Sequence, residues 1–377
     1  MKKILIIAPT FLPGYKGGGP VQSVKNIIEN LNDEFKFYVL TLDRDKGDNK
    51  PYSSIKTETW LEKDNYQIYY SSNKSMKKIR TCIKETQPDI IYLNSFFSWT
   101  DSIQIVLLNK LFLIKSKIII APRGEFDEGA IKIKKIKKKL YINAFNILGL
   151  GKYISWHATS ENEKANIINQ IPKADDIKVA NNLTSNYDKM ELKYREKVKG
   201  KLKLIFISRI TEKKNLLMAL SILKEVSVGD VQFEIYGPIE DEDYWKKCKE
   251  LVSQMPSNIK VSYLGEITHD KIINVLNQAH FFLFPTFGEN YGHVISESLI
   301  SGCPVIISKE TPWLELQNEN VGWDIDLNDK EKFISVINEC VNMNQKEYSL
   351  LSESSFNYAK KKSNLKENKK KTEQLFL

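Results

Sequence analysis

Short apolar runs alternate with longer segments of mixed polarity along most of the chain. The runs are rich in β-branched and aromatic residues, which is typical of strands buried on both faces of a sheet. They lie at residues 3–9, 35–42, 66–70, 89–94, 117–122, 153–159, 203–209, 231–237, 260–265, 280–285 and 304–308. Amphipathic segments such as 212–226 and 240–254 lie between them, so the pattern predicts repeated βα units and parallel sheets.

The pattern pauses at residues 182–201, a charged stretch without an apolar face, and a new run starts at Leu202. The length of 377 residues is also long for a single core. We therefore predict an α/β protein with two Rossmann-like domains, 1–190 and 191–355, followed by a helix and lysine-rich tail at 356–377. Because open parallel sheets bind ligands beyond the carboxyl ends of their strands, we expect the site in a cleft between two facing domains.

The composition, 42% hydrophobic and 27% charged, is that of a soluble globular protein. The start "MKKILIIAPTFLPG" resembles a signal peptide, but Pro9 and Pro13 interrupt it and no small-residue cleavage site follows, so we interpret it as a first strand. No run approaches the ~20 apolar residues of a membrane span. The four cysteines form no CxxC pair, which predicts buried thiols in a cytoplasmic protein: Cys82, Cys248, Cys303 and Cys340.

The net charge of +9 is concentrated in two lysine clusters, 131–139 and 360–371. Such clusters can be solvated helix faces, or they can attract anionic lipid headgroups at about 1 kcal/mol per basic residue. No helix-turn-helix or aromatic RNA-binding motif accompanies them, so no nucleic-acid partner is predicted. We expect peripheral association with an anionic surface at the inner face of the cell membrane.

Residues 281–308 place two carboxylates, Glu289 and Glu297, eight positions apart across a glycine-containing bend. A strand precedes the bend, and a helix is expected from near His293 to Gly302, with its N-terminus offering an anion site. One interpretation is that each acid binds a polyol and a diphosphate lies between them, as in a nucleotide sugar. The alternative is a dipole-favoured glutamate and a solvated loop acid.

The stretch "FPTFGENYGHVISESLISGCPVIIS" resembles the E-x7-E signature of retaining, family-4-type glycosyltransferases of the GT-B fold, with Ser298 in place of the usual Ala. The resemblance implies a GT-B architecture, in which two Rossmann-like domains face each other across a cleft. It also implies that Glu289 contacts the donor sugar and Glu297 the ribose. The donor-binding residues implied between them are Asn290, Tyr291 and Gly292.

The segment "FISRITEKKNLLMAL" (206–220) is similar to the family's G-R-x-x-x-x-K segment, with Ser208 where Gly is usual. The resemblance implies that Arg209 and Lys214 hold the donor diphosphate, and Lys213 is an alternative to Lys214. A strand end followed by a helix start also places a guanidinium and an ammonium where a phosphate can bind.

Two glycine segments resemble further parts of the family. The run "YKGGGPVQSVKNII" is similar to its GG(P/A) segment, which implies that Gly18 and Gly19 lie over the donor phosphates, and Gly237 is expected to line the nucleotide pocket. A dinucleotide site would need GxGxxG directly after the first strand and an acid about 20 residues on. Asp43 only partly satisfies that pattern, so we predict no NAD.

On the acceptor side, "PRGEFDEGAI" resembles a segment of one branch of the family. Many relatives carry a histidine in this loop, where this chain has Pro122, Arg123 and Gly124. We expect Arg123 and His157 to face the acceptor, although His157 can equally be a strand-end residue, and we interpret His269 as a surface residue.

These patterns together predict a retaining glycosyltransferase that moves a sugar from a nucleotide diphosphate to a lipid-linked saccharide. Its product would be a bacterial surface polysaccharide such as O-antigen, capsule or lipopolysaccharide. No cofactor or metal is predicted, because GT-B enzymes do not depend on an Asp-x-Asp site and short acidic pairs are expected by chance. The alternatives are a non-hydrolysing nucleotide-sugar epimerase of related fold and a basic binding protein without catalysis.

Overall fold

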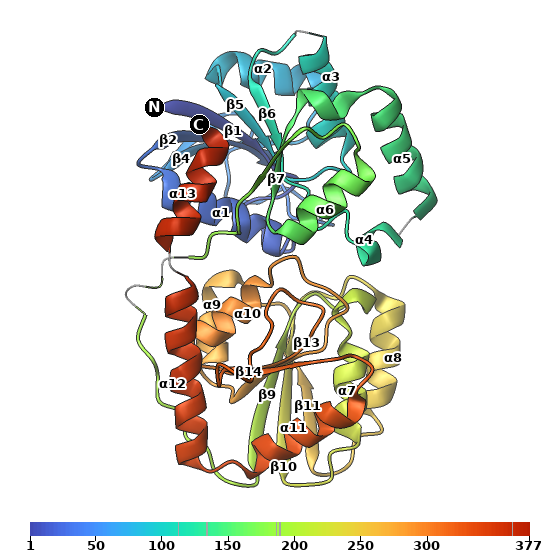
Figure 1. Ribbon diagram of the computed structural model, residues 1–377, viewed down its shortest axis with the longest axis vertical. Coiled ribbons are helices and arrows are strands. Elements are labelled where there is room, and N and C mark those ends of the chain that lie inside the picture. The colour runs from blue at the N-terminus through green and yellow to red at the C-terminus, as the bar shows by residue number, and fades with distance from the viewer. Residues whose placement is uncertain (112, 133–134, 186, 188–189, 364) are drawn as a thin grey trace. The chain divides into compact units, whose positions relative to one another are not determined.

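The computed structural model describes residues 1–377 except 112, 133–134, 186, 188–189 and 364. The chain forms an N-terminal unit of residues 1–185 and 365–377 and a C-terminal unit of residues 186–364. Each unit is a sheet of mainly parallel strands with helices packed along it (Figure 1). The boundaries therefore fall at residues 185 and 364, where the sequence led us to expect 190 and 355.

The sheet of the N-terminal unit has the strand order β3-β4-β2-β1-β5-β6-β7-β8. Its strands are β1 (Lys2–Ile7), β2 (Phe35–Leu42), β3 (Trp60–Lys63), β4 (Tyr66–Ser71), β5 (Ile90–Leu93), β6 (Lys117–Ile120), β7 (Ser155–Ala158) and β8 (Asp176–Val179). β3 pairs with β4 in antiparallel register, and the other described pairs are parallel. The helices are α1 (Gly19–Leu31), α2 (Met76–Thr86), α3 (Gln104–Lys110), α4 (Glu128–Lys132), α5 (Lys135–Ile147), α6 (Glu161–Gln170) and α13 (Leu365–Phe376).

The sheet of the C-terminal unit has the order β11-β10-β9-β12-β13-β14, and its described pairs are all parallel. Its strands are β9 (Lys201–Ile207), β10 (Asp230–Tyr236), β11 (Ile259–Tyr263), β12 (Phe281–Phe284), β13 (Val305–Ser308) and β14 (Gly322–Ile325). Its helices are α7 (Leu216–Lys224), α8 (Glu242–Val252), α9 (His269–Leu276), α10 (His293–Ile300), α11 (Lys330–Asn342) and α12 (Gln345–Lys362). A single 3-10 turn, η3 (Glu212–Lys214), precedes α7.

The central strands are buried on both faces, which explains why they were visible as apolar runs. Each side chain of β12 is 0% exposed, and β9 is buried from Leu204 to Ile207. Three further strands, β3, β8 and β14, were not predicted. All three lie at sheet edges, where one side lacks a neighbouring strand and the sequence need not be a continuous apolar run.

The lysine-rich C-terminus is part of the N-terminal unit, which corrects its interpretation as a tail. Its last helix, α13, buries Phe376 at 0% exposure, against Phe35 at 5.4 Å and Tyr92 at 5.6 Å between ring centroids. At the end of the chain, Lys2 Nζ donates to the carbonyl of Leu377 at 2.8 Å. The N-terminal unit is therefore completed by residues far away in sequence.

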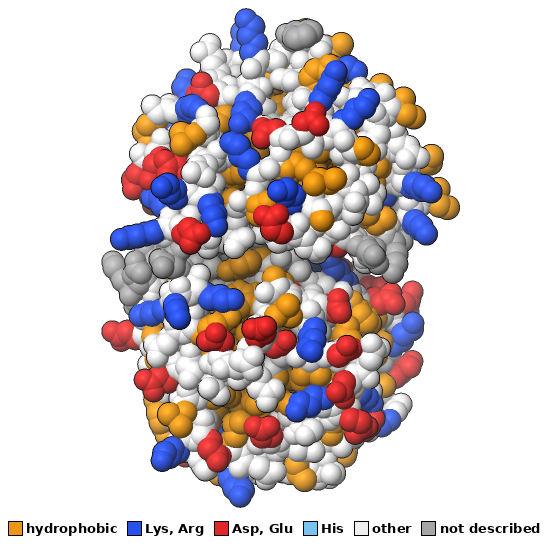
Figure 2. All heavy atoms as spheres, viewed as in Figure 1, with side chains coloured by type: hydrophobic (Ala, Val, Ile, Leu, Met, Phe, Trp, Pro, Cys, Tyr) orange, Lys and Arg blue, Asp and Glu red, His pale blue; other side chains and the backbone are white. Residues whose placement is uncertain are grey.

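The charged side chains of both units are mixed in sign on the face shown in Figure 2. The net charge of +9 therefore does not form one continuous basic surface there.

The four cysteines are free and buried, as predicted. Among the helices that the structure describes, none combines the length and apolar character needed to cross a bilayer.

Candidate functional site

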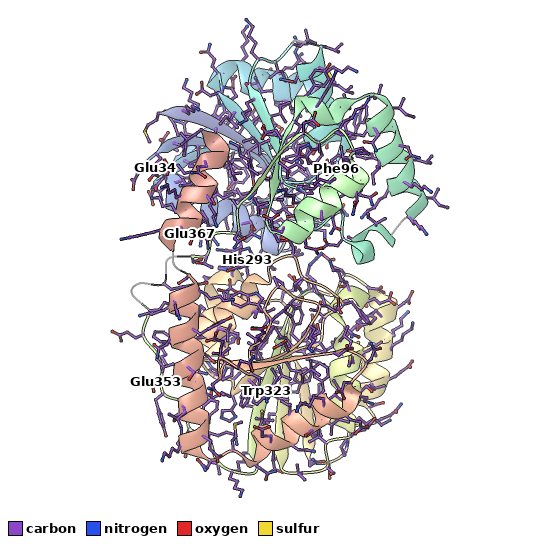
Figure 3. All side chains as sticks on the ribbon, viewed as in Figure 1. Glu34, Phe96, His293, Trp323, Glu353 and Glu367 are labelled. Carbon is purple, nitrogen blue, oxygen red and sulfur yellow. The ribbon has the colours of Figure 1, made fainter. Side chains whose placement is uncertain are left out.

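The bend after β12 is fixed by backbone hydrogen bonds to two neighbouring loops. Phe287 N donates to Lys213 O at 2.9 Å, and Glu289 N donates to Glu310 O at 3.0 Å. α10 begins at His293, as predicted and as labelled in Figure 3, after Gly292 with φ 78°. The bend is therefore built as a defined turn that holds Glu289 at the carboxyl end of β12.

Lys214 meets the carboxylate of Glu289 in this bend. Its Nζ forms an ion pair with Glu289 Oε1, and Lys214 is only 8% exposed. Burial lowers the pKa of the Lys214 ammonium, Glu289 acts against that shift, and Arg209 and Lys213 act with it. Because a buried ammonium needs a partner, the Glu289 carboxylate partly compensates for the burial of Lys214.

Arg209 lies close enough to Lys214 to affect its pKa and pairs with another acid. Its Nη1 donates to Glu240 Oε2 at 2.9 Å. Glu240 follows Gly237 in the loop after β10, where a Cβ on Gly237 would lie 1.9 Å from the carbonyl oxygen of Ser208. Glycine at 237 is thus required by the close approach of the two loops that carry Arg209 and Glu240.

Glu297 lies inside α10 and is 3% exposed. Its Oε1 accepts a hydrogen bond from His269 Nε2 at 2.7 Å, and its charge acts on the pKa of the half-buried Tyr291. Tyr291 packs between His293 and Trp313, with ring centroids 4.9 and 5.6 Å away. Glu297, the acid predicted to contact ribose, is therefore buried, and its hydrogen bond from His269 orients its carboxylate.

These contacts bring most of the predicted donor-side residues into one neighbourhood. Arg209, Lys214 and Glu289 form a charged cluster. A Cβ on Gly292 would lie 3.7 Å from Glu289 Cγ, which places the start of α10 beside that cluster. Glu289 pairs with Lys214 and Glu297 pairs with His269, so the two acids have different partners among the described residues.

The glycine-rich loop before α1 is held by an aspartate that the sequence did not single out. Asp45 Oδ2 accepts hydrogen bonds from Tyr15 N at 2.8 Å and Lys16 N at 3.1 Å. Gly18 has φ 67° at the start of α1, and Gly19 is the first residue of that helix. Asp45 lies 30 residues from Tyr15, so the spacing of the motif gave no signal for it.

Arg123 is held by three neutral groups at the carboxyl ends of strands. Its Nε donates to Asn94 Oδ1 at 3.1 Å, its Nη2 donates to Tyr92 Oη at 2.7 Å, and its Nη1 contacts Asn182 Oδ1. Its φ of 55° is unusual for a residue other than glycine. No ion pair to Arg123 occurs within the described residues, so its charge is oriented but not neutralised by a carboxylate.

His157 is a buried residue that shares a contact with Arg123, the hydroxyl of Tyr92. It is 1% exposed, and its ring nitrogens contact Tyr92 Oη at 2.7 Å and Ala180 O at 2.8 Å. Because a carbonyl only accepts, Nε2 carries the hydrogen and Nδ1 accepts from Tyr92. Burial, assisted by Arg123, lowers the pKa of His157 to about 3. The ring of His157 contacts Tyr92 Oη, which in turn accepts from Arg123, so His157 helps to position Arg123. This agrees with the alternative interpretation of His157 as a strand-end residue.

Two further features bear on the site. A cavity of about 480 Å³ lies in the N-terminal unit between α1 and the β3–β4 hairpin, lined by Phe11, Lys25 and Tyr66 among others, and contains none of the predicted site residues. Within the described residues, no group of three or more His, Cys, Asp or Glu side chains could hold a metal ion. Independence from metal stays a prediction.

Comparison with known proteins places these residues in a family context. Residues 189–371 match the family model described as Glycosyl transferases group 1. A 2-deoxystreptamine N-acetyl-D-glucosaminyltransferase of Niallia circulans is 28% identical over 28% of this chain and 27% of its own length. An uncharacterized glycosyltransferase of Methanocaldococcus jannaschii is 25% identical over 61% of this chain and 57% of its own. The chain thus spans about a quarter and just over half of these curated relatives.

Solved structures show the fold. HepE of Anabaena, solved with UDP and glucose, has a TM-score of 0.68 at 13% identity, with 100% of this chain and 98% of HepE covered. Sucrose-phosphate synthase of Thermosynechococcus elongatus has a TM-score of 0.71 at 13% identity over 100% and 98%. WaaG, a glycosyltransferase of lipopolysaccharide biosynthesis, has a TM-score of 0.64 at 12% identity over 95% of each chain. The predicted GT-B class with two Rossmann-like units is therefore confirmed, and the family match and relatives together support a glycosyltransferase.

Proposed function

We propose that this GT-B chain is a retaining glycosyltransferase that uses a nucleotide diphosphate sugar. The observation that carries the proposal is the buried Lys214–Glu289 pair beside Arg209, at the carboxyl ends of β9 and β12. Two cations suit a diphosphate and a carboxylate suits sugar hydroxyls. The UDP and glucose bound by HepE are consistent with this class of donor.

In the proposed reaction the bond from the anomeric carbon to the diphosphate oxygen breaks, and the acceptor oxygen bonds to the same carbon on the same face. The acceptor proton goes to the departing phosphate oxygen. In this proposal Arg209, Lys214 and the first amides of α10 stabilise the negative charge that develops on the leaving group. Preorganised donors of this kind typically contribute about 10² to 10³ in rate each.

A donor-hydrolysis assay tests the reaction class. We expect slow release of free sugar and nucleoside diphosphate, with Glu289→Ala and Arg209→Ala each abolishing release while the fold, checked by circular dichroism, stays intact. An epimeric sugar nucleotide as product would instead indicate the epimerase. Full activity in both variants would refute the site. Thermal stabilisation by UDP-, GDP- and dTDP-sugars identifies the donor, since ligand at 100 times its Kd adds about 2.7 kcal/mol.

We propose a lipid-linked saccharide as acceptor, at the inner face of the cell membrane, in the assembly of a bacterial surface polysaccharide. WaaG, named for lipopolysaccharide biosynthesis, is one of the structural neighbours. Arg123 supports an acceptor with an anionic group, because the described residues that hold its guanidinium are neutral. Transfer to a membrane extract that contains lipid-linked saccharides, followed by mass analysis of the lipid fraction, tests this assignment.

The membrane side of the proposal is supported by α5. Ile136, Leu140 and Ile147 are 77%, 65% and 83% exposed on this helix, and exposed lysines, including Lys135 and Lys139, accompany them. Figure 2 shows hydrophobic and basic side chains together along the edge that α5 occupies in Figure 1. Exposed apolar side chains next to lysines are the composition that binds an anionic bilayer surface.

Vesicle sedimentation tests this surface. The protein should sediment with phosphatidylglycerol vesicles and not with phosphatidylcholine vesicles, and the triple variant of Ile136, Leu140 and Ile147 to Ser should lose most of that binding. A matched change at exposed Leu350 of α12 (59% exposed) should have no effect. Equal sedimentation of the triple variant and the wild type would contradict the assignment.

A further inference from the structure

The starting observation is the contact between His269 and Glu297. Its atoms, His269 Nε2 and Glu297 Oε1, are 2.7 Å apart and join residues 28 positions apart in sequence. A carboxylate oxygen only accepts, so the hydrogen must be on Nε2. The contact therefore sets both the tautomer of the neutral ring and the orientation of one carboxylate oxygen.

The burial of the two partners differs. The Glu297 side chain is 4% exposed, whereas that of His269 is 34% exposed. A buried carboxylate is destabilised unless it is hydrogen-bonded, and within the described part of the chain His269 is the one hydrogen-bond partner of the Glu297 carboxylate. The second carboxylate oxygen, Oε2, accepts no hydrogen bond from the described residues, so it is left to bind a ligand.

The two helices that carry this pair are attached to the strand ends. His269 is the first residue of α9, which packs against α10. The loop before α9 is tied to the end of β10, because Gly237 N donates to Gly265 O at 2.8 Å. The pair is therefore anchored to the same edge of the sheet as the loop that carries Glu240 and approaches Arg209.

We propose that His269 is a positioning residue for the nucleoside of the donor. It holds Oε1 of Glu297 so that Oε2 accepts from the ribose hydroxyls, and it does not itself take part in bond breaking. This inference rests on the proposed function, in which Glu297 faces ribose. A purely structural tie between α9 and α10 would stabilise the fold but would not distinguish ligands with and without ribose hydroxyls.

A comparison of ligands and variants separates these roles. Binding of UDP, GDP and dTDP is measured by calorimetry to the full chain, and each is compared with its analogue that lacks the ribose hydroxyls. The variants are His269→Ala, His269→Gln, Glu297→Gln and the double variant His269→Ala/Glu297→Gln. Gln places an N–H close to the position of Nε2, so it should restore the hydrogen bond that Ala removes.

We expect His269→Ala to weaken the hydroxylated nucleotide about tenfold, as for the loss of a hydrogen bond to a charged group, and to change the hydroxyl-free analogue less than twofold. His269→Gln should stay within about threefold of wild type, and adding His269→Ala to Glu297→Gln should have little further effect. Equal weakening of both ligands by His269→Ala, or no weakening by it while Glu297→Gln weakens binding, overturns the role of His269. Failure of the wild type to bind any of the three nucleotides overturns the proposed function and this inference together.

Discussion

In the C-terminal unit, the candidate cations are paired with carboxylates, as in Lys214–Glu289 and Arg209–Glu240. In the N-terminal unit, the partners of Arg123 among the described residues are amide and hydroxyl oxygens. Paired charges fix side-chain positions and also provide both the cations and the acid that a sugar diphosphate needs. The neutral groups around Arg123 instead orient its positive charge and leave that charge available to an anion. In the proposed transfer reaction, we therefore assign the C-terminal unit to the donor and the N-terminal unit to the acceptor.

The largest expected effect concerns the stability of the N-terminal unit. Phe376→Ala removes a ring that is 0% exposed between Phe35, Phe37 and Tyr92, so it should lower the free energy of unfolding by about 3–5 kcal/mol. Leu377→Ala, at a residue that is 66% exposed, is the matched control and should change it little. Amide hydrogen exchange should become faster in the N-terminal unit only, because only that unit loses stability. An equal loss in both units would show that they do not unfold separately.

The next effect concerns the paired charges. Lys214→Ala should reduce donor hydrolysis by about 10² to 10³, because it removes a positioned cation from the leaving group. Lys213→Ala should change the rate less than fivefold, since Lys214 and not Lys213 meets Glu289. The comparison also settles which lysine serves the diphosphate, and a reversed order would assign that role to Lys213.

The pH dependence of the free energy of unfolding distinguishes two histidines with lowered pKa values, His157 and His280. The pKa of His157 is lowered to about 3 from the ordinary 6.5, so the unfolded chain binds more protons between these values and stability falls as the pH decreases. At pH 5 the loss relative to neutral pH should be about 2 kcal/mol. His157→Gln should remove this slope from the N-terminal unit while His280, with a pKa near 4, preserves one in the C-terminal unit. An unchanged slope in the exchange of N-terminal amides would contradict the assignment.

The smallest expected effect concerns the glycine-rich loop. Asp45→Asn should weaken the hydrogen bonds from Tyr15 N and Lys16 N by about 1 kcal/mol in total, which raises their exchange rates about fivefold. Asp48→Asn, which changes a carboxylate that accepts from the side chain of Lys16 at 2.8 Å, should leave the Tyr15 amide unchanged. Equal protection in both variants would mean that Asp45 does not hold the loop.

Sequence patterns predicted what is repeated or local in this fold. The run at 35–42 has the bounds of β2, and the eight-residue spacing placed Glu289 before α10 and Glu297 within it. β3 was not predicted because none of the side chains of "WLEK" is fully buried. β14 was not predicted because "GWDI" is short and contains Gly322 and Asp324, although three of its four residues are buried. A helix and lysine-rich tail were expected at 356–377, but the packing of α13 in the N-terminal unit was not predicted, because a lysine-rich helix with a short buried end has the sequence pattern of a solvated segment.

The partners of the site residues were less predictable for a physical reason. His269 lies 28 residues from Glu297, and Glu240 lies 31 residues from Arg209. Only the folding of the sheet brings these loops together, and a histidine after a strand has no spacing that marks it as a partner. His157 was visible as a polar residue near a strand end, but its complete burial depends on Tyr92 and Ala180 from neighbouring segments.

The most direct test of the central claim separates the diphosphate from the sugar. The affinities of the nucleoside diphosphate and of the intact nucleotide sugar are measured for wild type, Lys214→Ala and Glu289→Gln. We predict that Lys214→Ala weakens both ligands at least about tenfold, as expected for a lost charged contact, whereas Glu289→Gln weakens only the nucleotide sugar. Equal effects of Glu289→Gln on both ligands, or no effect of Lys214→Ala on either, would contradict the assignment of this pair to a sugar diphosphate.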